Sequence, residues 1–355
     1  MIDDCGEKSS TRKRHFCITD EIIAAHPEFT NRSLPSLDAR LAITEHAVLD
    51  LAAAAAANAI ADWGRPTADI THLVLATSAC AHAPSPDARL AKRLGLRPAV
   101  LRTSLLLHGC SGGCVALRLA KDIAGGDAGA RVLVVSADTH LLAFAAPDEA
   151  HLETIVVNAL FGDGAAAVVV GTTNPRIPDE RPIFHMVSSS QTTIEGTEEE
   201  VVMRISERGL DYNISGDVPA LVRGSIERCI VDAIAPLGLA AAAAGGGGGW
   251  NEMFWAMHPG GRAILDGYEE ALRLEHGKLD ASRRVLSEYG NMGGTTIIFV
   301  LDELRRRRRE EEDGLRFCEW GAMVGLGPGL TIEIMVLRAT GGPDDGKMMT
   351  ADIQP

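Results

Sequence analysis

Cys110 lies in a glycine-rich turn between two apolar segments, a setting that suits a nucleophile. The run HGCSGGC at 108–114 follows an apolar stretch at 105–107 and precedes one at 115–123 that predicts a buried helix. This order places Cys110 at a helix start, where the helix dipole and free backbone N–H groups stabilise a thiolate. The same segment is also consistent with a small buried cysteine that has no chemical role.

His258 and Asn291 lie at two further turns, each beside an apolar segment. His258 follows the apolar run 254–257 and precedes Pro-Gly-Gly. Strand ends carry functional sites in α/β folds, although a lone histidine there can be structural. Asn291 follows Gly290 and precedes Met-Gly-Gly, so a flexible backbone can present its amide. An imidazolium beside Cys110 would lower the thiol pKa and keep the thiol ionised, so the three residues form a candidate Cys/His/Asn set.

Two enzyme classes use an ordered Cys/His/Asn set. In a papain-like protease, histidine pairs with the thiolate and asparagine orients the histidine, and the spacing of Cys110 and His258 allows this. The residues around Cys110 argue against a papain-like protease. Cys110 is followed by Ser-Gly-Gly-Cys-Val, whereas papain-type enzymes carry Cys-Gly-Ser-Cys-Trp at the nucleophile. The second class condenses thioesters.

The elements that must position these residues alternate between strand and helix patterns. Short apolar runs predict strands, and longer helix-period segments predict helices between them. The strand-type runs are 71–77, 131–137, 165–171, 295–301 and 330–337, and the helix-type segments are 40–63, 218–237 and 263–274. This alternation predicts an α/β layered fold in which helices cover buried sheets.

A proline-containing break at 172–182 divides the chain into two halves of similar composition. We therefore predict an N-terminal half over 1–175 that carries the cysteine. The C-terminal half over 182–340 carries the histidine and asparagine, and an internally duplicated fold would suit the two. An alanine/glycine tract at 240–249 and the polar tail 341–355 are expected to be flexible.

Composition excludes several functional classes. The 355 residues are 46% hydrophobic, and no apolar run is long enough for a membrane span, so neither disorder nor a membrane protein is expected. A net charge of −14 and 4% aromatic residues argue against nucleic-acid binding. The basic run 305–309 precedes four acidic residues and reads as a charge-paired helix end. The start has no signal-peptide character and the cysteines show no metal-type spacing, which predicts a cytoplasmic protein without a metal site.

Four motifs in order make the sequence resemble the plant type III polyketide synthases, the chalcone and stilbene synthase family. They are ALFGDGAAA at 159–167, the HPGG core within 255–266, VLSEYGNM at 285–292, and the segment 320–331 that contains GLGPG. The resemblance extends over about residues 11–339. It implies a thiolase-like fold of two duplicated mixed five-stranded sheets with helices between and around them, a homodimer, coenzyme A thioesters as substrates, and no cofactor.

The same resemblance implies roles for single residues. Cys110 would take the starter acyl group from coenzyme A, and Phe161 would be the gate between the coenzyme A tunnel and the acyl cavity. The enolate formed from malonyl-CoA needs two fixed hydrogen-bond donors in a dry pocket, and the side chains of His258 and Asn291 fit this need. Contacts to coenzyme A are expected from the basic start of the chain and the turn after His258, at Lys8, Gly260 and Ala263.

Seven positions match pocket-lining sites of the family: Ser78, His140, Ala143, Met203, Tyr212, Gly293 and Leu326. Met203 stands where chalcone synthases have glycine and should crowd the cavity, while Ala143 for threonine and Gly293 for serine should open room. We therefore predict a long aliphatic starter and alkylresorcinol-like or alkylpyrone-like products. Chalcone, stilbene and curcuminoid synthesis are the alternatives. His140 can add a hydrogen bond to the growing chain or simply pack in the wall.

Two other functions fit parts of the sequence. A ketoacyl synthase of fatty-acid initiation also uses Cys/His/Asn, but it would need acyl carrier protein and a basic docking face. Family members usually begin earlier, with a further core strand, so a truncated, non-catalytic paralogue is the remaining alternative. Ala83 replaces a family methionine that reaches into the partner's cavity.

Overall fold

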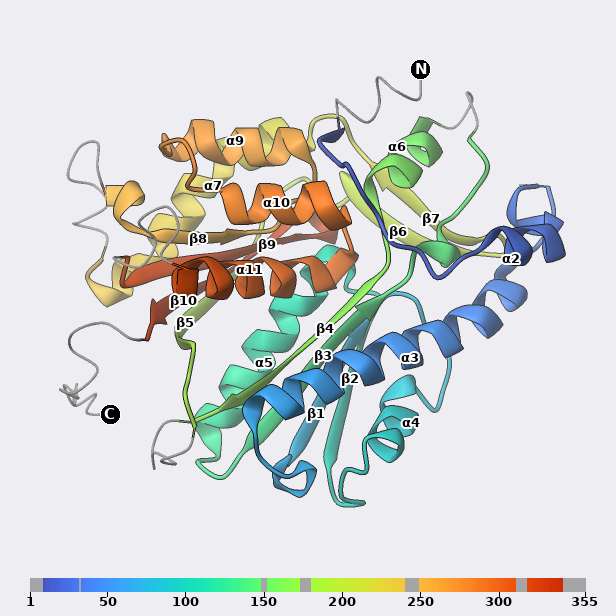
Figure 1. Cartoon of the computed structure of the whole chain (residues 1–355). Helices are drawn as coiled ribbons and strands as arrows, with labels where there is room; N and C mark the ends of the chain where they lie inside the picture. The colour runs from blue at the N-terminus through green and yellow to red at the C-terminus, as the bar shows by residue number, and fades with distance from the viewer. Residues whose placement is uncertain are drawn as a thin grey trace.

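The computed structural model describes residues 9–31, 33–147, 152–172, 180–239, 249–310 and 318–340 (Figure 1). Lys8, nearly all of the tract 240–249 and the tail 341–355, about which the sequence makes predictions, lie outside these residues.

The first sheet is formed by strands of the N-terminal half. Its order is β2-β1-β3-β4; β1 is parallel to β2 and β3, and β4 is antiparallel to β3. The strands are β1 (His72–Thr77), β2 (Leu101–Leu106), β3 (Arg131–Asp138) and β4 (Gly164–Gly171). All of β3 and nearly all of β1 is buried, which explains their near-continuous apolar sequences.

The second sheet repeats this mixed arrangement in the C-terminal half. Its order is β5-β10-β9-β8, with β8 parallel to β9 and the other pairs antiparallel. The strands are β5 (Phe184–Thr193), β8 (Phe254–Met257), β9 (Trp320–Gly327) and β10 (Thr331–Ala339). A separate hairpin joins β6 (Val201–Ser206) to β7 (Gly209–Ile214).

Helices form three layers around the two sheets (Figure 1). Buried side chains of α5 (Gly112–Gly126) and α11 (Thr296–Glu310) pack between the sheets. The outer face of the first sheet packs on α3 (Leu37–Trp63) and α4 (Pro86–Arg93). The outer face of the second packs on α7 (Val218–Ile234) and α9 (Arg262–Leu272), with α10 (Asp280–Tyr289) beside α9 and α11. This is the layered, thiolase-like α/β fold that the resemblance implies.

Single strands explain how the layers are specified. In β1, Leu73 and Leu75 belong to the core cluster shared with α3, whereas Val74 and Ala76 belong to the cluster shared with α5. Alternate residues of a strand point to opposite faces, so one apolar run joins two helical layers.

Two expectations about strands are wrong. The run 295–301 was predicted to be a strand, but it forms the 3₁₀ turn Gly293–Thr295 and the start of α11. A short apolar run fits a buried strand and a buried helix equally well, and here the helix continues into the charged residues that follow. The resemblance also implies five strands in each sheet, whereas the described residues form four in each.

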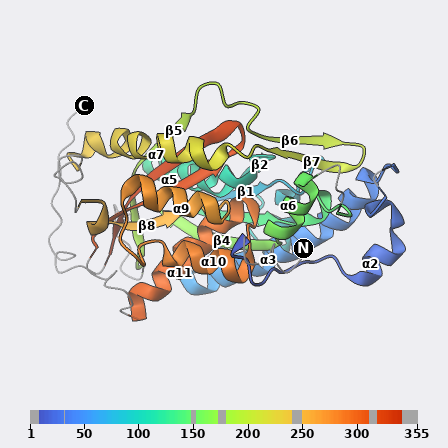
Figure 2. The ribbon, with the colours of Figure 1, turned by 90° about the horizontal axis from the view of Figure 1, so that it is seen from above.

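The remaining elements gather at one end of the molecule. In Figures 1 and 2, α2 (Asp20–Ala25), α6 (Leu152–Leu160) and the β6–β7 hairpin lie on the same side. Short 3₁₀ turns complete the described fold: Pro27–Phe29, Thr67–Asp69, Gly109–Ser111, His140–Leu142, Gly293–Thr295, Ala235–Leu237, Gly249–Glu252 and Pro328–Leu330.

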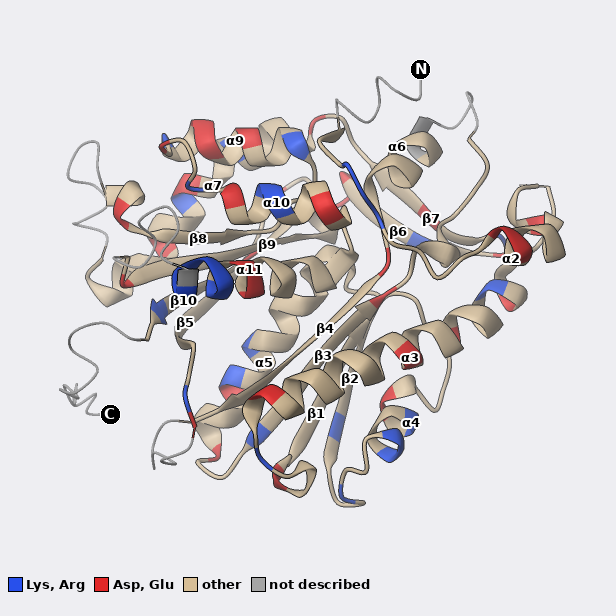
Figure 3. Cartoon of the chain, in the orientation of Figure 1, with Lys and Arg blue, Asp and Glu red and all other residues tan. Residues whose placement is uncertain are grey.

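Basic residues concentrate at the end of α11 (Figure 3). Arg305 pairs with Asp62 at 2.6 Å and with Asp302 at 2.6 Å, and Arg307 pairs with Glu303 at 2.9 Å. Arg305 and Arg307 are therefore paired with acids on α3 and on their own helix. Within the described ranges, no helix combines the length and apolar character needed to cross a membrane.

Candidate active site

The turn after β2 presents Cys110 at the N-terminal end of α5. Gly109 has φ of +56°, a conformation that side chains disfavour, and its N–H donates to Ser78 Oγ at 3.0 Å. The 3₁₀ turn Gly109–Ser111 then leads into α5, which begins at Gly112. The sequence-based expectation that Cys110 lies at a helix start is thus confirmed.

Direct backbone contact brings the asparagine turn against this helix. A Cβ added to Gly113 would collide with the carbonyl oxygen of Gly294, and one added to Gly294 would lie 2.7 Å from the Gly113 nitrogen. Only glycine permits this approach at both positions. Asn291, just before Gly294, consequently has its side-chain nitrogen Nδ2 3.6 Å from Cys110 Sγ.

Hydrogen bonds fix which end of the Asn291 amide faces the thiol. Its Oδ1 accepts from the Gly293 N–H at 3.0 Å. Thr296 Oγ1 lies 3.3 Å from the same oxygen, but its hydroxyl has a shorter acceptor in Gly293 O at 2.9 Å. Asn291 Oδ1 lies 3.8 Å from the sulfur. Because Oδ1 accepts from the Gly293 N–H, Nδ2 is the end of the amide that can donate toward a charge that forms at Cys110.

His258 is held at the end of β8 with its ring unpaired. Its backbone N–H donates to Val324 O at 2.8 Å, and 1% of the residue is exposed. Neither ring nitrogen has a hydrogen-bond partner in the described part of the chain. Buried polar atoms without partners are rare in folded proteins and often mark reactive groups. Gly260 lies beside the ring: a Cβ added there would be 3.8 Å from Nε2.

Burial shifts the pKa values of Cys110 and His258 in the directions that favour their neutral forms. Desolvation raises the pKa of the Cys110 thiol to about 12, although the Asn291 hydrogen bond opposes the shift and the Asp138 charge adds to it. Desolvation lowers the pKa of His258 to about 4. The loss of hydration thus opposes both charges of the predicted thiolate–imidazolium pair. Acyl transfer from this state requires the thiol proton to move as the bond forms.

A small cavity joins Cys110 to most of the predicted pocket. It has a volume of about 20 Å³, enough for about one water molecule. It brings together residues far apart in the sequence, and its lining includes Ser78, Cys110, His140, Ala143, Phe161, Tyr212 and Gly293.

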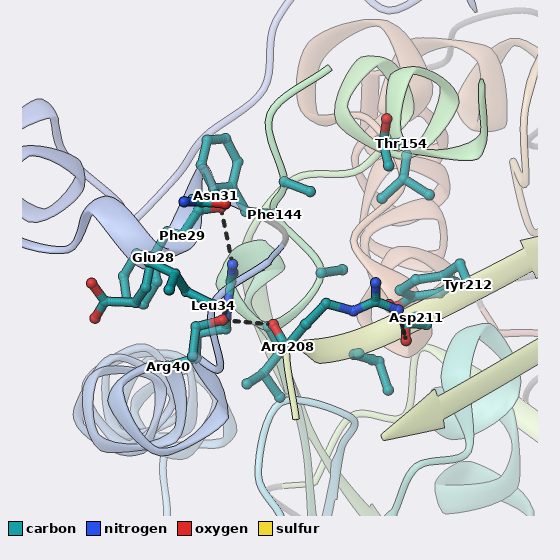
Figure 4. Close-up of a pocket in the computed structure, with 16 residues that line it drawn as sticks. Glu28, Phe29, Asn31, Leu34, Arg40, Phe144, Thr154, Arg208, Asp211 and Tyr212 are labelled. Atoms are coloured by element: carbon teal, nitrogen blue, oxygen red, sulfur yellow. Dashed lines mark hydrogen bonds and ion pairs between the residues drawn. The ribbon is translucent and has the colours of Figure 1, made fainter. Parts of the chain in front are cut away.

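A second cavity of about 240 Å³ adjoins the first and shares Ala143, Leu210 and Tyr212 with it (Figure 4). In Figure 4, Phe29 and Tyr212 lie on opposite sides of this space. Buried Arg40 holds two residues that line this cavity, because it donates to Ser36 Oγ at 2.8 Å and to Phe29 O at 3.1 Å. The shared residues are therefore the partition between the nucleophile and the larger space.

Phe161 lies between this partition and Asn291. Its ring is parallel to the His140 ring at 6.0 Å and tilted against the Tyr212 ring at 5.3 Å. The backbone on either side is tied to the asparagine: Asn291 N–H donates to Leu160 O at 2.8 Å, and Gly162 N–H donates to Asn291 O at 3.0 Å. The aromatic wall and the asparagine turn are thus one connected unit.

Asp138, at the end of β3, is a site residue that sequence reasoning missed. Its carboxylate accepts from Ser78 N–H at 2.6 Å and from Gly294 N–H at 3.1 Å, joining the turns on both sides of Cys110. Burial raises its pKa to about 7. Its position directly after a buried strand was the available signal. Asp138 also corrects the expectation for Gly293: a Cβ there would lie 2.8 Å from Asp138 Oδ2, so the missing serine opens no free space.

Other predicted residues lie outside the cavities. Met203 packs against the nucleophile turn, where a Cβ added to Gly109 would lie 2.8 Å from its sulfur. Leu326 packs in the core of the C-terminal half and lines neither cavity described here. Ala263 is exposed in the first turn of α9.

The basic N-terminal segment borders the gate. Arg12 donates to Glu288 at 2.5 Å, which fixes the segment against α10. The Arg14 side chain packs against the glycines beside Phe161 and Asn291, since Cβ atoms added to Gly162 and Gly290 would lie 3.4 Å and 2.9 Å from it. Within the described ranges, no group of three or more His, Cys, Asp or Glu side chains could hold a metal ion.

Comparison with known proteins gives two findings. The family model described as chalcone and stilbene synthases, N-terminal domain, matches residues 2–175, and the corresponding C-terminal domain matches residues 185–341. A bisdemethoxycurcumin synthase of Oryza sativa subsp. japonica is 52% identical over 334 residues, which cover 94% of this chain and 82% of that protein.

Proposed function

This chain belongs to the chalcone and stilbene synthase family of type III polyketide synthases, and we propose that it loads an acyl group from coenzyme A onto Cys110 and extends it with malonyl-CoA. The observation that carries this proposal is the Asn291 amide nitrogen, 3.6 Å from Cys110 Sγ and oriented as a donor. His258, with both ring nitrogens unpaired among the described residues, supplies the base and the second donor.

Acyl transfer begins from the neutral thiol. Cys110 Sγ attacks the thioester carbonyl while its proton passes to His258, and coenzyme A leaves as its thiol after taking up a proton. The buried site makes a lasting thiolate unfavourable, so proton transfer and attack must be closely coupled.

Extension uses the same two donors. Malonyl-CoA loses carbon dioxide, and the electron pair of the broken bond forms an enolate whose oxygen accepts hydrogen bonds from Asn291 Nδ2 and protonated or neutral His258. The enolate carbon then attacks the acyl carbonyl on Cys110, which releases the cysteine sulfur. Phe161 excludes water from this space and so protects the thioester.

The starter is an aromatic acyl-CoA such as 4-coumaroyl-CoA, giving curcuminoid-type products. Two observations support this choice: the cavity wall contains the rings of His140, Phe161 and Tyr212, and the relative at 52% identity is a bisdemethoxycurcumin synthase. Aromatic rings bind well against aromatic walls.

A long aliphatic starter, with alkylresorcinol-like or alkylpyrone-like products, is the second candidate. The cavity of about 240 Å³ behind Ala143 favours it, because a flexible chain could pass this small side chain. Chalcone and stilbene formation are further outcomes that product analysis would detect.

Coenzyme A binding and assembly complete the proposal. The basic segment with Lys8, Arg12 and Arg14 contacts the phosphates, and Gly260 and Ala263 at the start of α9 border the pantetheine entry. The protein acts as a cytoplasmic homodimer without a cofactor, with two functional halves over 1–175 and 182–340.

Incubation with malonyl-CoA and a panel of starters, followed by mass spectrometry of the products, tests this function. Curcuminoid-type products from 4-coumaroyl-CoA, absent with the Cys110→Ala protein, are expected. Condensation only with acyl carrier protein substrates would instead indicate a ketoacyl synthase. No product from any starter, with co-assembly with an active relative, would indicate a non-catalytic paralogue.

A further inference from the structure

His140 lies in the wall of the small cavity and has no part in the reaction described above. It follows β3 in the 3₁₀ turn His140–Leu142, and 6% of it is exposed. Its backbone N–H donates to Asp163 Oδ1 at 2.6 Å, and its ring lies near the rings of Phe16 and Phe161. The imidazole is thus held in place on the cavity that also contains Cys110.

Asn158 on α6 determines which ring nitrogen of His140 carries the hydrogen. The Asn158 Nδ2 group donates to Ala145 O at 2.6 Å, which turns Oδ1 toward His140 Nε2 at 3.3 Å. An amide oxygen can only accept, so Nε2 must carry the hydrogen and Nδ1 must be the acceptor. Burial, which lowers the pKa of His140 to about 4, keeps the ring neutral.

The Nδ1 atom makes no hydrogen bond within the part of the chain that the structure describes. The neighbouring ring walls of Phe16 and Phe161 are apolar. An acceptor in such a wall favours a donor on the ligand and offers nothing to a ketone or thioester oxygen, which are themselves acceptors. The matching chemical group is a hydroxyl.

We propose that His140 is a specificity-determining residue whose Nδ1 accepts a hydrogen bond from a hydroxyl of the acyl chain. The inference rests on the proposed function, because it takes an acyl group bound at Cys110 as the ligand. The hydroxyl comes either from a phenolic starter or from the enol of the β-ketoacyl intermediate. No bond is made or broken at His140.

Three substitutions separate the acceptor from the bulk of the ring. In His140→Asn, Oδ1 is attached to Cγ, as Nδ1 is, so an acceptor remains in place. In His140→Gln, the amide reaches toward the former Nε2 position and leaves no acceptor at the Nδ1 position. His140→Leu removes both. Val156→Ala, at a half-exposed residue of α6, is the control for changes near this helix.

Loading of Cys110 by 4-coumaroyl-CoA and by cinnamoyl-CoA, which lacks the hydroxyl, is measured by intact-protein mass spectrometry. The rate of the first condensation is measured separately after malonyl-CoA is added. If the phenol is the donor, the wild type and His140→Asn load 4-coumaroyl roughly tenfold faster than cinnamoyl, and the ratio falls to near one in His140→Gln and His140→Leu. If the enol is the donor, the loading ratio is the same in all proteins, and the condensation rate falls roughly tenfold for both starters in the Gln and Leu variants alone.

The inference is overturned if neither quantity distinguishes His140→Asn from His140→Gln. That pair decides the question even if His140→Leu fails to fold, which thermal melting would reveal. A preserved loading preference without any condensation would contradict the proposed extension reaction and support the role of His140. Absence of loading by either thioester in the wild type would contradict both.

Discussion

The reaction centre and the cavity wall of this protein are built in different ways. Backbone contacts hold the centre: Gly113 and Gly294 touch directly, and the Asp138 carboxylate ties Ser78 N–H to Gly294 N–H. The wall consists of side chains such as Ala143 and Tyr212, which come from separate elements and divide two cavities. Backbone geometry tolerates few substitutions, whereas a side-chain wall can change without loss of the fold.

If the centre depends on one thiol, Cys110→Ala should abolish acyl loading completely. Acyl transfer needs a sulfur nucleophile at the Asn291 amide, and an alanine leaves none. Intact-protein mass spectrometry after incubation with an acyl-CoA measures the adduct. Cys114→Ala is the matched control, since Cys114 is fully buried in the core between the sheets. An adduct that persists in Cys110→Ala would refute the assignment.

The two donors should matter less than the nucleophile but more than any wall residue. Removing one fixed donor to a developing oxyanion typically lowers the rate by about 10²- to 10³-fold. We expect His258→Gln and Asn291→Leu each to reduce carbon dioxide release from malonyl-CoA to this extent. Thermal melting serves as the control for folding. Carbon dioxide release at the wild-type rate in both proteins would eliminate the proposed role.

The turns that bring Cys110 and Asn291 together could be predicted from the sequence because their geometry depends on local glycines. A cysteine, a histidine and an asparagine beside glycine-rich turns imply strand or helix ends, and such ends meet in an α/β fold. The charge state of the centre could not be found in this way. The pKa shifts of the thiol and the imidazole come from desolvation, which depends on the packing of both halves.

The wall was harder to predict. A residue's identity gives the volume of its side chain, but the free space depends on neighbours from distant segments. Gly293 was expected to open room, yet Asp138 occupies the space at its Cβ position. Leu326 was expected in the pocket and packs in the core instead. The prediction of a strand at 295–301 was wrong for a related reason, because these residues begin helix α11. A segment buried on all sides lacks the periodicity that distinguishes a strand from a helix.

The neutral resting state of the centre can be tested through its pH dependence. A thiol with a pKa near 12 is almost wholly protonated at neutral pH. As long as the pH stays below this pKa, each increase of one pH unit raises the thiolate fraction roughly tenfold. Alkylation of Cys110 by iodoacetamide should therefore accelerate by this factor between pH 7 and 10. Peptide mass spectrometry of the labelled cysteine gives the rate. A rate that is already constant above pH 6 would instead demonstrate a thiolate–imidazolium pair.

Substitution of Gly113, whose backbone contacts Gly294, should destabilise the protein at the reaction centre. Gly113→Ala forces a Cβ onto the Gly294 carbonyl, and such overpacking typically destabilises a protein by about 1–3 kcal/mol. Gly224→Ala is the matched control, since its Cβ in helix α7 would meet nothing within 4 Å and should stabilise the helix by about 0.5–1 kcal/mol. Thermal or urea unfolding measures both. Equal stability of the two variants would show that the turns are not constrained by this contact.

The wall should show the smallest effects, and they should alter the choice of starter more than the chemistry. Ala143→Leu adds apolar bulk where the two cavities meet, so it should hinder a long acyl chain more than a compact aromatic one. Changes of this size in an apolar pocket discriminate by about 1–3 kcal/mol, or roughly 10- to 200-fold. Competition between a long-chain acyl-CoA and 4-coumaroyl-CoA measures the shift, and Ala57→Leu, at an exposed position of α3, controls for added bulk. If the preference between the two starters is unchanged, neither starter passes Ala143. If Ala143→Leu loses as much malonyl decarboxylation as Asn291→Leu, the cavity wall and the reaction centre do not act separately.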